Sequence, residues 1–374
     1  MLSSPQKPDK EWLAKSATAA KNLPGTRFGW FQSHAHLVLL PAMCVMLASK
    51  QSLWLFTEDA SSRTATPVLQ REDAYWFPVL GSGVLFGLFA ILKFLGNDWL
   101  KQAIAALMVS TCAFGLASNI DAFAQLVRNK RGAPVYLRLP SLALEIALLD
   151  LLGMVVASVL AVTYVWTKNW IANNLLGFSF CLLGIRSVNL SSYSTGVVLL
   201  SGLFLYDVFW VFFSQPVFGS NVMVSVAKGV EAPNKLMLPR DFGGCGDLQF
   251  NMLGLGDIAV PGLFLAFLAK WDAVKMADVS SKSFVYLNSA VVAYMISLAT
   301  TVMVMMVFQH PQPALLYICP FVLIASLAVA IARGELPDLV AFSLPEDSEA
   351  KGDNEEHNRN EPKVSEDDKS GVHE

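Results

Sequence analysis

Nine runs of apolar residues, each about as long as a bilayer-crossing helix, dominate this chain of 374 residues. A run of about 17 to 25 apolar residues can span the hydrocarbon core of a membrane as an α-helix. Because lipid offers no partners for backbone N–H and C=O groups, a spanning segment must satisfy them internally, as a helix does. The sequence therefore predicts an all-α polytopic membrane protein with nine transmembrane helices, near residues 35–56, 75–95, 103–120, 151–167, 169–186, 195–213, 252–269, 284–308 and 313–332.

Composition agrees with this class, because 54% of the residues are hydrophobic and only 15% are charged. Residues 1–34 lack an apolar segment of the kind found in cleavable signal peptides, so none is expected before the first span. From about Glu335 onward acidic and polar residues replace apolar ones, which is typical of a disordered tail. We therefore divide the chain into an N-terminal segment 1–34, a bundle of spans one to five at 35–186, a region of spans six to nine at 187–336, and a tail at 337–374.

Lysine and arginine residues in the predicted loops indicate the orientation. The odd-numbered loops carry ten of them and the even-numbered loops five, although the basic N-terminal segment argues the other way. Since cytosolic loops are enriched in Lys and Arg, the odd loops and the C-terminal tail are expected in the cytosol and the N-terminus in the lumen.

Two acidic residues, Asp207 and Asp257, lie inside the sixth and seventh predicted spans. An ionisable residue at membrane depth is costly and is a functional signal by default. Each lies five or six residues from the end of its span at the same face, so roughly 7 to 9 Å deep at 1.5 Å per residue. Adjacent antiparallel helices would bring them level, where two carboxyl groups could share one proton as in aspartic proteases.

Residues near the aspartates suit close approach of a peptide. Gly254 and Gly256 precede Asp257 and remove side chains beside it, which lets another backbone come near. Pro313 begins the ninth span at the same membrane face, where proline fits a first helical turn. Each of these features also has a bland explanation, as helix packing or an ordinary helix start.

Two other functional classes use intramembrane acids. A transporter or ion-leak pathway could carry protons or cations on Asp207 and Asp257, although the chain shows no inverted sequence repeat. A non-catalytic scaffold for membrane segments is the third reading, and retention of both aspartates counts against it.

Three short motifs together resemble a known family. Tyr206-Asp207, Gly254-Leu255-Gly256-Asp257 and Pro313-Ala314-Leu315 occur in the order and on the spans typical of the GxGD intramembrane aspartyl proteases, which include presenilin and the signal peptide peptidases. The longer stretches 168–174, 206–212 and 221–228 resemble signal peptide peptidase rather than presenilin, and the similarity is clear from about Trp166 to Leu336.

This resemblance implies a presenilin-like fold with a lumenal N-terminus and a cytosolic C-terminus. It implies that Asp207 and Asp257 are the catalytic pair, and that the active site is shaped by Tyr206, Gly254, Leu255, Gly256, Pro313, Ala314 and Leu315. It also implies cleavage of type II transmembrane segments and signal-peptide remnants in the endoplasmic reticulum membrane, without metal or organic cofactor. The lipid bilayer and the substrate helices are then the partners, self-assembly into a homo-oligomer is open, and nothing indicates nucleic-acid binding.

A mechanism follows from the shared proton. One ionised aspartate would take a proton from a water, while the other, protonated, would donate a hydrogen bond to the scissile carbonyl group. A substrate helix must unwind before attack, and extended backbone at membrane depth is tolerable only inside protein or beside water. The backbone around Gly254 and Pro313 could bind the unwound segment, with an added strand from residues 221–228.

Some features depart from the family or carry less weight. The segment 214–220 is longer than in typical signal peptide peptidases, and the chain ends without the dilysine retrieval signal that some members have. The five cysteines are expected to be core residues, and His34 with His36 is not expected to bind a metal. The sequon at Asn189 is expected to stay unused, and Gly83 with Gly87 is expected to serve ordinary helix packing.

Overall fold

The computed structural model describes residues 24–59, 67–95, 98–128, 135–139, 144–219, 232–239, 250–278, 284–308 and 312–344, together with Val222, Val226 and Gly229. Every predicted span overlaps a helix in this part of the chain. These helices are α2 (Pro24–Asp59), α3 (Arg71–Ala90), α4 (Asp98–Arg128), α5 (Leu148–Thr167), α6 (Trp170–Ser187), α7 (Tyr193–Val208), α10 (Gly256–Asp278), α11 (Val285–Phe308) and α12 (Leu315–Arg333).

Within the described residues, six helices are long and apolar enough to cross a membrane. They are α2, α4, α11, α12, and two that continue as π-helices, α3 into η1 (Ile91–Leu95) and α7 into η3 (Phe209–Phe213). Helix α5 has a shorter apolar stretch, Leu151–Thr167. The multi-pass helical class is thus confirmed, and nine crossings stay a prediction.

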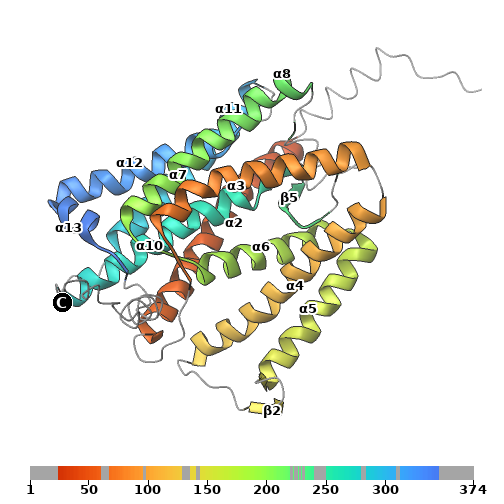
Figure 1. The fold of residues 1–374 in the computed structure, drawn as a ribbon, viewed down its shortest axis with the longest axis horizontal. Helices are drawn as coiled ribbons and strands as arrows, with labels where there is room; N and C mark the ends of the chain where they lie inside the picture. The colour runs from red at the N-terminus through yellow and green to blue at the C-terminus, as the bar shows by residue number, and fades with distance from the viewer. Residues whose placement is uncertain are drawn as a thin grey trace, which may run out of the picture.

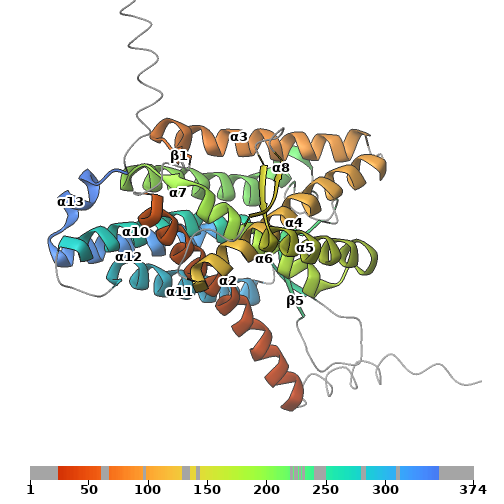
Figure 2. The ribbon, with the colours of Figure 1, turned by 90° about the horizontal axis from the view of Figure 1, so that it is seen from below.

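Two groups of helices make up the bundle (Figure 1). Helices α4 and α5 pack together beside α6, whereas α10 and α11 pack with each other and with both α2 and α12, and α7 lies against both α3 and α12. Figure 2 shows α3 running along α7 at one side of the bundle. Gly202 permits this approach, because a Cβ atom there would lie 2.7 Å from Cγ of Pro78.

Helix α10 occupies the centre of the hydrophobic core. Its residues Phe264, Leu265 and Phe267 are at most 1% exposed, and the surrounding core residues come from α2, α6, α7, α11 and α12. A helix that is apolar on every side is expected in the middle of a bundle rather than at its surface. The chain places Asp257 at the start of this central helix.

Several loops meet at one end of the bundle. Strand β1 (Val68–Leu69) pairs in parallel with β4 (Asn189–Leu190), and Ser192 pairs with Ser343 beyond helix α13 (Leu336–Ala341). The segments after α2, between α6 and α7, and after α13 are therefore on the same side. This is the relation between odd loops and C-terminal segment that the charge pattern predicted, while the side that faces the cytosol stays a prediction.

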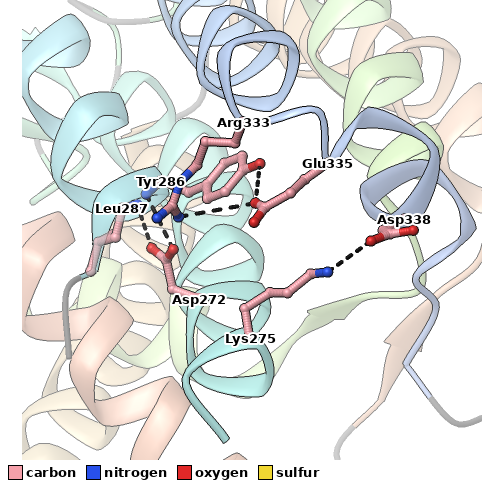
Figure 3. Close-up of polar contacts among 7 residues, drawn as sticks. All are labelled: Asp272, Lys275, Tyr286, Leu287, Arg333, Glu335 and Asp338. Atoms are coloured by element: carbon pink, nitrogen blue, oxygen red, sulfur yellow. Dashed lines mark hydrogen bonds and ion pairs between the residues drawn. The ribbon is translucent and has the colours of Figure 1, made fainter. Parts of the chain in front are cut away.

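A polar cluster fixes the ends of α10, α11 and α12 at this end (Figure 3). The carboxylate of Asp272 accepts hydrogen bonds from the backbone N–H groups of Tyr286 and Leu287, at 3.2 and 2.8 Å, so it caps the start of α11 from a neighbouring helix. The hydroxyl of Tyr286 donates to Glu335 at 2.9 Å, just after α12 ends. The cluster joins the three helices at the end opposite to Asp257.

The buried residues Lys270 and Asn189 meet at this end of the bundle. Lys270 was counted as a loop residue, but α10 continues to Asp278 and Lys270 is a buried helix residue, 1% exposed. Its ammonium group donates to the side chain of Asn189, which is itself buried. The side chain of Asn189 is therefore bonded inside the protein, in keeping with the expectation that its sequon is not glycosylated.

Two minor expectations concern packing. The described cysteines, Cys44, Cys112, Cys181 and Cys319, are buried free thiols, as expected of core residues, while Cys245 lies outside the described residues. At Gly83 and Gly87, an added Cβ would meet no described atom within 4 Å. Among the described residues nothing packs against these two glycines, so the prediction that they serve helix packing is not confirmed.

Candidate active site

Asp207 lies in the last turn of α7 and is 2% exposed. Its Oδ2 atom accepts a hydrogen bond of 3.1 Å from the backbone N–H of Leu315, the first residue of α12. The first N–H groups of a helix have no partner within the helix, and its N-terminus favours negative charge. The start of α12 is therefore a ready-made donor site for the Asp207 carboxylate.

The α7 helix changes its geometry directly after Asp207. Residues Phe209–Phe213 form the π-helix η3, and short π-helical segments are frequent at functional sites. The indole N–H of Trp210 donates to the hydroxyl of Ser82 on α3 at 3.1 Å. The ring of Tyr206 contacts Trp210, with 6.4 Å between ring centroids, so Tyr206 lies between the aspartate and α3.

The long segment 214–220 extends this aromatic contact. Its described part forms helix α8 (Ser214–Phe218), and the ring of Phe218 stacks on Trp210 with centroids 5.9 Å apart. Phe218 also contacts Phe86 and Phe89 of α3. The insertion therefore fastens the end of α7 to α3 next to Asp207.

Asp257 lies in the first turn of α10, and its side chain is partly exposed. The predicted seventh span began at residue 252 as a helix, and this is wrong, because β6 (Phe250–Gly254) precedes α10 as an extended strand. The prediction failed because an apolar run of this kind suits a strand as well as a helix. An aspartate placed where strand becomes helix has extended backbone on its N-terminal side.

The two glycines before Asp257 differ in their surroundings. A Cβ atom at Gly254 would lie 3.1 Å from Oδ2 of Asp257, whereas one at Gly256 would meet no described atom within 4 Å. Gly254 therefore makes room for the carboxylate of Asp257 itself. Gly256 is exposed and leaves the backbone beside Asp257 open to another chain.

Leu255, between the glycines, anchors this segment in the core. Its side chain is 5% exposed and packs against Gly177 of α6. Its carbonyl oxygen accepts from the N–H groups of Ile258 and Ala259 and lies 3.6 Å from the Cys181 thiol. The strand-to-helix turn is therefore held by α6 as well as by α10.

Pro313, Ala314 and Leu315 form the turn that leads into α12. The helix begins at Leu315, after Pro313, and the carbonyl of Ala314 accepts from Tyr317 and Ile318. Ala314 and Leu315 are 8% and 5% exposed. The turn is buried against α7, where Leu315 binds Asp207.

The three motifs therefore meet at one place. Asp207 lies close enough for its charge to act on the carboxyl group of Asp257, and the thiol of Cys319 is within reach of both charges. Cys319 lies one turn of α12 beyond Leu315. It was not identified from the sequence as part of this site. Its position next to two acids could have been inferred only from helix pairing.

A β-hairpin next to the aspartates was missed by the sequence analysis. Strand β5 (Lys235–Pro239) pairs antiparallel with β6, and Met237 lies opposite Met252. The side chain of Asn174 on α6 both accepts from the N–H of Met237 at 2.8 Å and donates to its carbonyl at 2.7 Å. Asn173 donates to the carbonyl of Lys235 at 2.7 Å. Two consecutive asparagines at the start of an apolar helix were the available signal.

This pattern shows which backbone groups of β6 point away from β5. Asn174 occupies the outer edge of β5, and the N–H of Leu255 donates to Asn234, so odd-numbered residues of β6 face β5. In an antiparallel pair, neighbouring residues point their backbone groups to opposite edges. Met252 and Gly254 therefore direct their N–H and C=O groups away from β5, toward the side where Asp257 follows.

The expected strand within residues 221–228 is not present at the described positions. Val222 and Val226 are helical and pack with Phe89 and Trp210, and the strand lies further along the chain, in β5. The pattern of residues 221–228 suits one buried helix face, which explains the error.

Among the described residues, no group of three or more His, Cys, Asp or Glu side chains is arranged to hold a metal ion.

Comparisons with known proteins identify the family of this chain. The profile of a family described as signal peptide peptidase matches residues 60–346. The chain is 32% identical over 356 residues to "Signal peptide peptidase" of Mus musculus, covering 89% of each chain. It is 39% identical over 221 residues to "Intramembrane protease 2" of Caenorhabditis elegans, covering 56% of this chain and 45% of that one. A solved presenilin family intramembrane aspartate protease covers 79% of this chain and 99% of its own, at 12% identity and a TM-score of 0.47.

Proposed function

Since the chain belongs to the signal peptide peptidase family and is an intramembrane aspartic endopeptidase, we propose that Asp207 and Asp257 are its catalytic pair. The observation that carries this proposal is the meeting of the three motifs. Leu315 binds Asp207, and α10, which carries Asp257 in its first turn, packs against both α7 and α12. No other function is favoured by a specific contact in the described residues.

The two acids have different surroundings, which suits different roles. Asp207 is buried, which opposes ionisation, and it accepts an N–H from the start of α12, which favours the ionised form. Asp257 is partly exposed beside the open backbone of Gly256. Carboxyl groups that share one proton can hold a water and polarise a carbonyl group together, which is the chemistry of peptide hydrolysis.

We propose that the substrate binds as an added strand on the edge of β6 that faces away from β5. The N–H and C=O groups of Met252 and the C=O group of Gly254 would pair with the unwound substrate, while the N–H group of Gly254 bonds the carboxyl group of Asp257, to which this edge leads. Added strands gain affinity from main-chain hydrogen bonds and largely ignore side-chain identity. Such recognition suits an enzyme that cleaves many different transmembrane segments, here type II membrane proteins and signal-peptide remnants.

A substitution at Asn174 tests this strand model. In Asn174→Leu, Met237 loses both partners, so β5 and with it the edge of β6 should lose their fixed position. We expect kcat/KM for a transmembrane peptide to fall by about tenfold, mainly through a higher KM, because the substrate loses a fixed strand edge to bind. A tenfold change corresponds to a loss of about 1.4 kcal/mol of binding free energy. Asn288→Leu, at an exposed position on α11, is the matched control and should cleave normally. Equal KM values in the two variants would contradict the model.

We place the protein in the endoplasmic reticulum membrane, with the N-terminus lumenal and the C-terminal tail cytosolic. The excess of Lys and Arg in the odd loops supports this orientation. A glycosylation acceptor inserted within residues 228–245 should be modified, and one inserted after Arg333 should not. Modification after Arg333 alone would show the opposite orientation.

Covalent capture tests the proposed function as a whole. A photoreactive transition-state analogue of aspartyl proteases should label the wild-type protein, and unlabelled analogue should compete. Transition-state analogues bind far more tightly than substrates only where a complementary site exists. A transporter or a scaffold would show no competed labelling, and that result would overturn the proposal.

A further inference from the structure

Helix α10, which carries Asp257 in its first turn, has a defect one turn later. In an α-helix the carbonyl of residue 257 accepts from the N–H of residue 261, and in α10 this residue is Pro261. Proline has no N–H, and its ring pushes against the carbonyl four residues earlier. The backbone carbonyl of Asp257 is therefore left without its regular helical donor.

Tyr294 of α11 supplies the missing donor. Its hydroxyl donates a hydrogen bond of 3.1 Å to the carbonyl oxygen of Asp257, and its side chain is 0% exposed. A buried carbonyl without a donor would cost about 1 to 3 kcal/mol. The tyrosine therefore satisfies the very group that Pro261 leaves open.

This bond acts on the orientation of the Asp257 side chain. The carbonyl, Cα and carboxyl group of Asp257 belong to one residue in the first turn, where few helical bonds hold the backbone. Two residues earlier, the thiol of Cys181 lies 3.6 Å from the Leu255 carbonyl, so α6 and α11 hold the turn from two directions. A shift of about 1 Å in a catalytic group can cost about a hundredfold in rate.

We propose that Tyr294 is a positioning residue for peptide cleavage. Its hydroxyl group holds the backbone carbonyl of Asp257, which lacks a helical donor because residue 261 is a proline. This inference rests on the proposed role of Asp257. Tyr294 would act on the turnover of bound substrate and not on substrate binding, because it touches the aspartate from the side of the core. It is set apart from the other buried tyrosine of α11, Tyr286, whose hydroxyl binds Glu335 at the far end of the bundle (Figure 3).

The removal of one hydroxyl group gives the first measurement. In Tyr294→Phe we expect kcat for a transmembrane peptide to fall by about tenfold and KM to change by less than about twofold, the pattern of a lost interaction that matters only for the chemical step. Tyr286→Phe is the matched control, with the same chemical change on the same helix. It should lower thermal stability but keep kcat within about twofold of wild type.

A double-mutant cycle with Pro261→Ala gives the decisive measurement. Alanine at this position would restore an N–H that can donate to the Asp257 carbonyl, so the hydroxyl of Tyr294 should become dispensable. We expect Pro261→Ala and Pro261→Ala/Tyr294→Phe to have kcat values within about twofold of each other. This comparison also holds if Tyr294→Phe alone does not fold.

Each outcome of the cycle is informative. An equal loss from Tyr294→Phe in both backgrounds, or a loss in Tyr286→Phe as large as in Tyr294→Phe, would overturn the positioning role. Cleavage that persists in Asp257→Asn would instead refute the proposed function, whatever the tyrosine variants do. The two failures are therefore distinguishable.

Discussion

Asp257→Asn is expected to abolish cleavage of a type II membrane substrate while the protein stays folded and still binds that substrate. Asparagine has nearly the shape of aspartate but cannot exchange the proton, so the hydrolytic cycle loses one of its two acids. Asp207→Asn should abolish cleavage in the same way. The fold should be kept, because the amide oxygen can still accept from Leu315 at the start of α12. We expect a loss of about a thousandfold or more in kcat for each variant, of the order seen when one member of a catalytic unit is removed.

The double variant should be hardly slower than either single one, since residues that act as a unit are not additive. Asp272→Asn is the matched control, because it neutralises another buried acid on the same helix. One of the two N–H groups of Tyr286 and Leu287 would lose its acceptor, so stability should fall while cleavage continues (Figure 3). Product formation, thermal unfolding and substrate co-purification in detergent would be compared for all variants. Substantial cleavage by either single catalytic variant would remove that carboxylate from the mechanism.

The helices were predictable from the sequence because a membrane leaves the backbone so few choices. Apolar runs of the right length marked all the major helices, and the aspartates stood out because carboxylates are costly among such residues. The position of the segments after α2 and between α6 and α7 on the same side also followed from the order of crossings. These inferences depend on local composition and on the order of crossings alone.

The structure around Asp257 was harder to predict, because it depends on contacts between distant segments. The strand β6 was assigned to a helix, since an apolar run before Gly254 fits both. Asn174 holds β5 from 63 residues away, and Tyr294 reaches the carbonyl of Asp257 from 37 residues away. Such side-chain contacts are decided by how helices pack, so no pattern within one segment reveals them.

Gly254→Ala is expected to lower kcat by about ten- to a hundredfold with little change in KM. The added methyl group would lie 3.1 Å from Oδ2 of Asp257, tighter than an ordinary contact, so the carboxyl group has to move by a few tenths of an ångström. It cannot move freely, because Tyr294 holds the carbonyl of the same residue and Leu255 is packed against α6. Misplacement of a reacting group is costly in rate at this scale. Initial rates over a range of peptide concentrations in detergent would separate kcat from KM.

Gly256→Ala is the matched control, because the same methyl group two residues later meets no described atom within 4 Å. Neither glycine has a positive φ angle, so alanine is free of backbone strain at both positions. We expect kcat to stay within about threefold of wild type, since Asp257 need not move. A substrate strand that approaches the exposed backbone at Gly256 would, however, meet the methyl group, and KM should then rise. A fall in kcat as large as that of Gly254→Ala would show that the contact between residue 254 and Asp257 does not govern catalysis.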